Sequence, residues 1–250
     1  MKPFSFIIVA RNDNYNCSYD GEVIDRLKTC ITSIHTNYPE SEVILVDWCT
    51  SGRPKLKEYF TENVRNIYIS PSFNSILKNE SGSNCDFYEY LGKHVGIELS
   101  THSQVVCTNM DTILPIGLNA FQDEIDSGCV ILGKRMDIAQ ERIHHPIAEN
   151  IQMANLNTHQ IQGYAYNANG DFLCCQKKVY YAIGGYRLVH TNWDVDNEFV
   201  RRASRTHKCI KEYTLFHIEH PESHTKRERP FEPKAISIEV LRQIKLHTEI

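Results

Sequence analysis

The sequence predicts an α/β protein with a mostly parallel central sheet flanked by helices. Short, continuous apolar runs, typical of strands buried on both faces, alternate four times with amphipathic stretches in the first part of the chain. With 250 residues, 41% of them hydrophobic, the chain is long enough to bury one substantial core. No repeat or Gly/Ser linker divides it, so we expect a single domain with an irregular insertion.

The first part of the chain carries the clearer pattern. Strands are expected where apolar residues run together, at 4–10, 42–46, 66–69 and 104–107. Helices are expected where apolar residues recur every three or four positions, at 23–35, in a short stretch from Pro54, and at 88–100. Residues 74–86 are predicted to form a polar loop. Strands that alternate with helices indicate parallel pairing.

The pattern is weaker after residue 115. Expected elements are a helix at 117–125, a strand at 130–132, an irregular segment at 137–169, a turn, strand and short helix from Gly170, a helix after Asp194, a strand at 208–216 and a surface helix at 234–247. The segment 137–169 is rich in His, Asn and Gln and has little periodicity. We therefore interpret it as the insertion.

Composition narrows the classes of function. The net charge of −4 gives no overall positive field that would attract nucleic acid. No run of 18 apolar residues is present, so no membrane-spanning helix is expected. The first residues lack a signal-peptide cleavage pattern, which favours a cytoplasmic location. The nine cysteines are odd in number and lack C-x-x-C spacing, so buried free thiols are expected.

Polar side chains follow three of the predicted strands where each strand ends. Arg11 and Asp13 follow the first, Asp47 the second, and Asn109 and Asp111 the fourth. Ligands of parallel α/β sheets bind beyond the carboxyl ends of the strands. One carboxylate can hold Mg²⁺ or Mn²⁺ when a diphosphate supplies further oxygen ligands. An Asx turn at the strand end is the simpler alternative for Asn109. No G-x-G-x-x-G follows the first strand, which argues against a dinucleotide-binding domain.

Two later segments carry candidate chemistry. HIEHPESH contains His217 and His220, but cysteine partners for zinc are missing, and residues three apart on a strand face opposite sides. A loop of surface histidines is the alternative. NWDVDNEFVRR contains Asp194 and Asp196, which fit an N-cap and a first helical turn, or a general base at a cleft. Capping does not explain Trp193.

Several motifs occur together in a specific order. They are FSFIIVARNDN, EVILVDWCT, CTNMD, GDFLCCQKKVYYAIGGY, WDVDNEFVRR and HIEHPESH. This series, over residues 4–224, resembles the GT-A nucleotide-diphosphosugar transferases, in particular the family-2-like inverting glycosyltransferases. The resemblance implies a GT-A domain at 1–225, with a nucleotide-binding half at 1–111 and an acceptor half at 112–225, and a tail at 226–250. It also implies a nucleotide-sugar donor, with UDP as the default nucleotide, Mn²⁺ or Mg²⁺, and a glycan or other hydroxyl acceptor.

The resemblance assigns residues to the donor nucleotide. Arg11, Asp13 and Asp47 would hold the base and ribose. Lys93 matches a basic residue that such enzymes place near the nucleotide. These assignments predict that all four side chains surround one cavity.

The resemblance also assigns the metal and the sugar pocket. Asn109 and Asp111 match the D-x-D metal motif, with Asn in place of its first Asp, so metal contact is expected mainly through Asp111. His220 matches a late metal-ligating histidine. Gly170 and Asp171 would form the floor of the donor-sugar and acceptor pocket.

The catalytic base implied by the resemblance is Asp194. Trp193 takes the place of the preceding glutamate of the family motif and is assigned to the donor site. Two alternatives stay open: a sugar nucleotidyltransferase, although the expected Gly-rich loop after the first strand is missing, and a non-catalytic carbohydrate-binding protein of the same fold.

Overall fold

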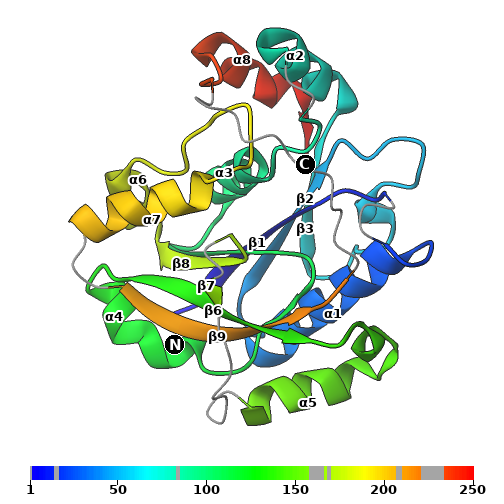
Figure 1. The fold of residues 1–250 in the computed structure, drawn as a ribbon, viewed down its shortest axis with the longest axis vertical. Helices are drawn as coiled ribbons and strands as arrows, with labels where there is room; N and C mark the ends of the chain where they lie inside the picture. Colours follow the sequence, from blue (N-terminus) through cyan, green and yellow to red (C-terminus); the bar gives the residue numbers. More distant parts are fainter. Residues whose placement is uncertain are drawn as a thin grey trace.

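A computed structural model describes residues 2–13, 17–82, 85–157, 166–167, 170–206, 210–220 and 234–250. These residues form one ten-stranded mixed sheet with helices on both faces (Figure 1). The strand order is β10-β3-β2-β1-β4-β8-β6-β9-β5, and β7 pairs with β6 beside this path. The predicted α/β class with a helix-flanked sheet is confirmed.

The four strands of the parallel half occur where the sequence predicts them. They are β1 (Phe4–Ala10), β2 (Glu42–Trp48), β3 (Val64–Ile69) and β4 (Gln104–Thr108), and each pairs in parallel with its neighbour. The connections carry α1 (Glu22–Asn37), the 3-10 turn η1 (Leu56–Glu58), α2 (Pro71–Ser81) and α3 (Glu89–Leu99). Helices long enough to cross over the sheet allow this parallel pairing.

The second half of the sheet is mixed, so the prediction of a mostly parallel sheet is wrong there. Its strands are β5 (Thr112–Ile113), β6 (Val130–Ile138), β7 (Tyr166–Asn167), β8 (Phe172–Gln176) and β9 (Ile210–Ile218). Strand β8 runs antiparallel to both β4 and β6, whereas β9 is parallel to β6. The helices are η2 (Leu118–Phe121), α4 (Gln122–Asp126), η3 (Gln140–His144), α5 (Ile147–Asn157), α6 (Lys177–Ile183) and α7 (Val195–Thr206).

Two segments predicted as loops contain helices. Helix α2 overlaps the predicted polar loop 74–86. It begins with Pro71 at its first position and ends at Ser81, followed by Gly82, whose φ of 67° suits a helix cap. Few of its residues are buried, so its many polar residues concealed the helical spacing of the apolar ones. Helix α5 lies within 137–169; residues 158–165, 168 and 169 of that predicted insertion lie outside the described residues.

The segment 234–250 packs onto the parallel half of the sheet. It contains α8 (Ile238–Gln243), the 3-10 turn η4 (Ile244–His247) and β10 (Thr248–Glu249), which pairs antiparallel with β3. Figure 1 shows α8 beside α2 at one end of the molecule. The predicted surface helix is therefore present, but Ile236 and Val240 are buried in the main core.

Alternate residues of the central strands supply two cores, one on each face of the sheet. Ile7 and Val9 face α2, α3, α6, α7 and α8, whereas Phe6 and Ile8 face α1 and α4. Helix α3 lies unusually close to β1, because a Cβ atom at Gly92 would lie 2.7 Å from a methyl carbon of Val9. This close packing brings the polar residues of α3 underneath the end of β1.

The described cysteines depart from the prediction at one position. Cys129 is disulfide-bonded, so the expectation of free thiols throughout is wrong for this residue. Seven other described cysteines are free, and five of them are buried: Cys30, Cys49, Cys107, Cys174 and Cys175.

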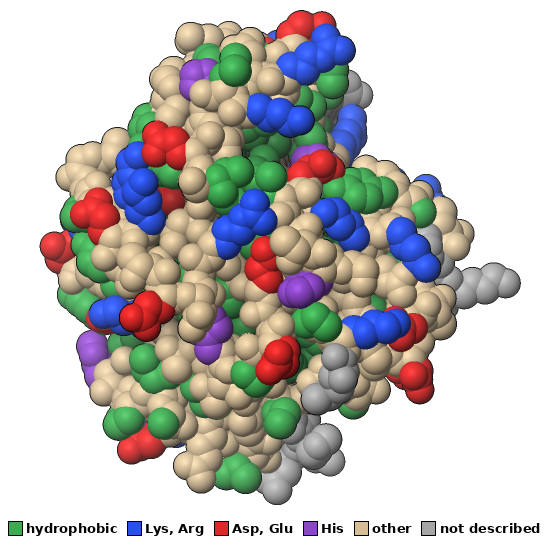
Figure 2. All heavy atoms as spheres, turned by 180° about the vertical axis from the view of Figure 1, so that it is seen from behind, with side chains coloured by type: hydrophobic (Ala, Val, Ile, Leu, Met, Phe, Trp, Pro, Cys, Tyr) green, Lys and Arg blue, Asp and Glu red, His purple; other side chains and the backbone are tan. Residues whose placement is uncertain are grey.

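Among the described residues, no helix has the length and apolar character needed to cross a bilayer. Figure 2 shows basic and acidic side chains interspersed over one face of the molecule, in line with the small net charge.

Candidate functional site

A cavity of about 430 Å³ lies at the carboxyl ends of β1 and β4. The chain runs from β1 outward to β2 and β3 on one side and then returns to β4 on the other. The adjacent ends of β1 and β4 therefore mark the point at which the strand order reverses, where open α/β sheets bind ligands. The lining residues are Val9, Ala10, Arg11, Asp13, Asp86, Phe87, Glu89, Asn109, Met110, Asp111, Arg135, Asp171, Asn192, His217 and His220.

One end of the cavity contains a group of three potential metal ligands, Asp111, His217 and His220. Each offers one ligand atom, and the three atoms lie within 4.8 Å of one another. Asp111 Oδ2 lies 3.1 Å from His220 Nε2 and 3.5 Å from His217 Nε2. The backbone N–H of Ile218 donates to the Asp111 carbonyl, which ties the turn after β4 to β9. The group is thus fixed by backbone pairing.

The donor set fits a divalent cation. Asp111 is only 7% exposed, and its second oxygen, Oδ1, has no hydrogen-bond partner among the described residues. Burial opposes ionisation of Asp111, but the hydrogen bonds from His217 and His220 outweigh it and hold the pKa of the carboxyl far below its usual range. Burial also opposes protonation of His217, yet the bond to Asp111 raises its pKa. Positive charge is therefore favoured at this point, and a metal ion can supply it in place of protons.

The expectation that His217 and His220 face opposite sides is wrong. Strand β9 ends at Ile218, so His220 lies beyond the strand and its alternation. The two rings lie 5.2 Å apart between centroids and meet edge to face. His217 thereby joins the predicted ligands Asp111 and His220.

Asn109 is held by hydrogen bonds on both sides of its amide. Its Oδ1 accepts from Lys93 Nζ at 3.0 Å, and its Nδ2 donates to Asp171 Oδ1 at 2.8 Å. An ammonium can only donate, so these partners define which atom is the oxygen. The amide oxygen faces Lys93, which agrees with the expectation that Asp111 provides the metal contact.

Lys93 lies beneath the cavity and is absent from its lining. The side chain is 1% exposed and also donates to Glu89 Oε1 and to the carbonyl of Gly170. Burial opposes the charge, but Glu89 outweighs it and raises the pKa of Lys93. In this position Lys93 can orient Asn109 and the turn at Gly170, and it does not reach a ligand directly.

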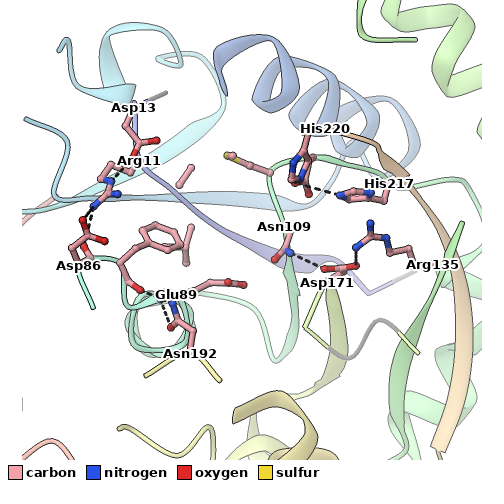
Figure 3. A pocket seen from close by; sticks show the side chains of 15 residues that line it. Arg11, Asp13, Asp86, Glu89, Asn109, Arg135, Asp171, Asn192, His217 and His220 are labelled. Carbon is pink, nitrogen blue, oxygen red and sulfur yellow. Dashed lines mark hydrogen bonds and ion pairs between the residues drawn. The ribbon is translucent and has the colours of Figure 1, made fainter. Parts of the chain in front are cut away.

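The opposite end of the cavity is formed by Arg11, Asp13 and Asp86 (Figure 3). Arg11 Nε donates to Asp13 Oδ2 at 2.6 Å, and its Nη1 donates to the carbonyl of Asp86 at 3.0 Å. The guanidinium lies over the Phe87 ring, 5.7 Å from its centroid. The predicted pair Arg11 and Asp13 therefore does line the cavity, beside an aromatic ring that the sequence reading did not include.

Asp47 is separated from this cavity. Its carboxylate is buried at the end of β2, where Oδ2 accepts from the backbone N–H of Leu56 at 2.9 Å, and burial raises its pKa. It borders a second cavity of about 20 Å³ near Lys55 and Tyr68. The structure therefore does not bring Asp47 together with Arg11 and Asp13.

Trp193 and Asp194 lie on the loop before α7 and do not line the cavity. Trp193 is 47% exposed. Asp194 has a φ of 62°, and its carboxylate accepts from Arg201 at 2.7 Å and from Asn197 at 3.1 Å. Asp196 does not line the cavity either, but it lies against Gly170, where a Cβ atom would come within 3.4 Å of its Oδ2.

Strand β6 contributes two further residues. Arg135 Nη1 donates to Asp171 Oδ2 at 3.2 Å, and Asp137 Oδ1 accepts from His217 Nδ1 at 2.8 Å. Burial and the neighbouring Asp111 carboxylate raise the pKa of Asp171. The sequence analysis missed Asp86, Phe87, Glu89, Arg135 and Asn192, and it set His217 aside. The polar alternation Arg135-Met136-Asp137 after an apolar run is the signal for a longer strand with one polar face.

The fold and the site together define an α/β protein with a candidate metal centre at the strand-order reversal of its sheet. Comparison with known protein families found no family model that matches this chain, and comparison with curated proteins found no match.

Proposed function

We propose that this protein is a metal-dependent glycosyltransferase of the GT-A type. It would transfer a sugar, with inversion, from a nucleotide-diphosphate donor, with UDP as the default nucleotide, to the hydroxyl of a glycan or other acceptor. The observation that carries the proposal is the cavity at the carboxyl ends of β1 and β4, which has three potential metal ligands at one end and an arginine beside an aromatic ring at the other. A nucleoside diphosphate presents the complementary groups in that order.

The cavity residues divide the donor between them. Arg11 and Phe87 would contact the base and ribose, because a guanidinium and an aromatic face recognise a planar ring. The diphosphate would lie beside Asp111, His217 and His220. A divalent cation bound there would neutralise the charge that develops on the leaving diphosphate. Asp171, held by Asn109 and Arg135, is placed to accept hydrogen bonds from hydroxyls of the donor sugar.

The geometry favours Asp196 over Asp194 as the general base. The Asp194 carboxylate is occupied by an ion pair with Arg201 and a hydrogen bond from Asn197. Asp196 lies against Gly170, next to Asp171, and interacts with the hydroxyl of Tyr90. The acceptor hydroxyl would lose its proton to Asp196 as its oxygen attacks the anomeric carbon.

The ligand types of Asp111, His217 and His220 also indicate which cation would bind. Imidazole nitrogens bind Mn²⁺ and later transition metals better than they bind Mg²⁺, whose preferred ligands are oxygens. Of the two cations expected from the sequence, Mn²⁺ fits two histidines and one carboxylate better. We therefore take Mn²⁺ as the first cation to test.

Thermal-shift and turnover measurements with a panel of nucleotide sugars test the proposal. We expect Mn²⁺ to raise the Tm of the wild-type protein, Mg²⁺ to do so less, and one nucleotide sugar to add a further increase only when Mn²⁺ is present. That donor should then be hydrolysed slowly without acceptor. The variant Asp111→Asn should lose both effects. A panel with no stabilising donor and no hydrolysis would refute the transferase, and formation of a nucleotide sugar from a sugar phosphate would indicate a nucleotidyltransferase.

A cytoplasmic location belongs to the same proposal. The seven free cysteines among the described residues are typical of a reducing compartment, whereas the disulfide at Cys129 is not. Thiol labelling of Cys129 in freshly lysed cells measures whether that disulfide forms in the compartment where the protein resides.

A further inference from the structure

Asp137 and His217 are direct neighbours on the adjacent parallel strands β6 and β9. His217 Nδ1 lies 2.8 Å from Asp137 Oδ1, and its Nε2 lies 3.5 Å from Asp111 Oδ2. A carboxylate accepts hydrogen bonds, so the Nδ1 atom of His217 carries the hydrogen that faces Asp137. The Nε2 atom of the same ring points to the candidate metal centre.

We propose that Asp137 is a positioning residue that holds His217 in the ring orientation and tautomer needed to bind the cation through Nε2. The inference rests on the metal centre of the proposed function. A ligating histidine usually donates its second ring N–H to a carboxylate or carbonyl, which orients the ring and increases its basicity. Asp137 is in none of the motifs and does not line the cavity; it contacts Nδ1 of His217, whereas Asp111 lies at Nε2 of the same ring.

A second contact extends this role to the floor of the site. Asp137 Oδ1 also accepts from Arg135 Nε at 2.6 Å, and Arg135 Nη1 reaches Asp171 at 3.2 Å. Arg135 and Asp137 lie two residues apart on β6 and therefore share one face of the sheet. One carboxylate thus orients a metal ligand and, through Arg135, the acid that we place at the donor sugar.

The position of Asp137 makes it suitable for substitution. Its side chain is 27% exposed, whereas that of His217 is 5% exposed, so its truncation creates no buried cavity. Loss of the carboxylate should therefore change the site more than it changes the fold. The variant Asp137→Asn keeps an acceptor oxygen for Nδ1 and serves as the conservative replacement.

Calorimetric titration of the protein with Mn²⁺ alone, without donor, tests the inference. We expect Asp137→Ala to weaken Mn²⁺ binding by about 10–100-fold and Asp137→Asn to recover most of that loss. Asp123→Ala, which removes an exposed acid on α4, controls for the loss of one negative charge and should leave Mn²⁺ affinity unchanged. Arg135→Gln should not weaken Mn²⁺ binding, because it removes a positive charge near the site.

A double-mutant cycle separates a positioning role from a general electrostatic one. If Asp137 acts through His217, then Asp137→Ala should cause no further loss of Mn²⁺ affinity in a His217→Ala background. A full additional loss in that background, or less than a tenfold loss in the single variant, would overturn the inference. A wild-type protein that binds Mn²⁺ with this dependence on Asp137 but turns over no nucleotide sugar would refute the proposed function and leave the inference standing.

Discussion

The Nζ atom of Lys93 donates a hydrogen bond to Oδ1 of Asn109 across 3.0 Å, joining the buried side of α3 to the turn after β4. The same ammonium donates hydrogen bonds to Glu89 and to the carbonyl of Gly170, so it connects three segments beneath the cavity. The variant Lys93→Met would leave three partly buried acceptors without this donor. We expect the free energy of unfolding to fall by about 3 kcal/mol or more, measured by urea denaturation. Lys57→Met, at an exposed position, should change it by less than about 0.5 kcal/mol.

Asn109→Asp would restore a second acid to the motif after β4. The new carboxylate would face Asp171 where the amide now donates across 2.8 Å, so repulsion should lower the Tm of the metal-free protein. The added negative charge beside Asp111 should at the same time strengthen cation binding. Thermal shift with and without Mn²⁺ should therefore show a lower starting Tm and a larger increase than in wild type. An equal increase in both proteins would contradict this.

The two acids before and within α7 should differ in their effect on catalysis. Asp196→Asn should reduce kcat by about 10²–10⁴-fold, the usual contribution of a general base, with little change in Tm. Asp194→Asn should keep most of the turnover, because its carboxylate is bound to Arg201. Steady-state rates with the donor found in the panel measure both. The reverse ranking would restore the assignment of Asp194 made from the sequence.

Glu42 should make stability sensitive to acid. Its Oε2 accepts from Ser5 Oγ at 2.6 Å and from the backbone N–H of Thr101 at 2.9 Å. Burial opposes ionisation, but these bonds outweigh it and lower the pKa below 4.5. A lowered pKa in the folded state means that the contribution is complete above pH 4.5 and is lost as the pH falls through the folded value.

The variant Glu42→Gln isolates that contribution. At neutral pH it should reduce the free energy of unfolding by about 1.5 kcal/mol, the scale of a hydrogen bond to a charged group. The difference from wild type should narrow as the pH falls through the folded-state pKa of Glu42, below which both proteins carry a neutral side chain. Glu40→Gln, at an exposed position, is the matched control. A difference independent of pH would show that the charge of Glu42 is not the cause.

The parallel half of the sheet could be predicted closely because its strands are continuous apolar runs. Helix α2 could not, since only a few of its residues, among them Phe73 and Leu77, are buried, and polar residues fill the rest. The antiparallel direction of β8 could not be predicted either. Strand direction depends on how the intervening chain crosses the sheet, and most of the chain between β6 and β8 falls in 137–169, where the sequence has little periodicity.

At the site, the sequence predicts where a residue lies along the chain better than it predicts the direction of its side chain. Asp111 and His220 meet as expected, because a strand end and the segment after β9 define where they lie. His217 was set aside on strand alternation, which fails because β9 ends one residue later. Asp47 occurs at the expected strand end, but its carboxylate turns to the N–H of Leu56, a local contact that no motif encodes.

The segment 234–250 has a consequence for how the chain folds during synthesis. Lys234 donates to the carbonyl of Glu80, a residue made 154 positions earlier, and Ile236 and Val240 cover apolar side chains of α2. Until the ribosome releases these late residues, the outer surface of α2 and the free edge of β3 stay uncovered. Contacts of such long sequence separation form slowly, and an open strand edge promotes association with other chains. Nascent protein should therefore depend on chaperones until residues 234–250 dock.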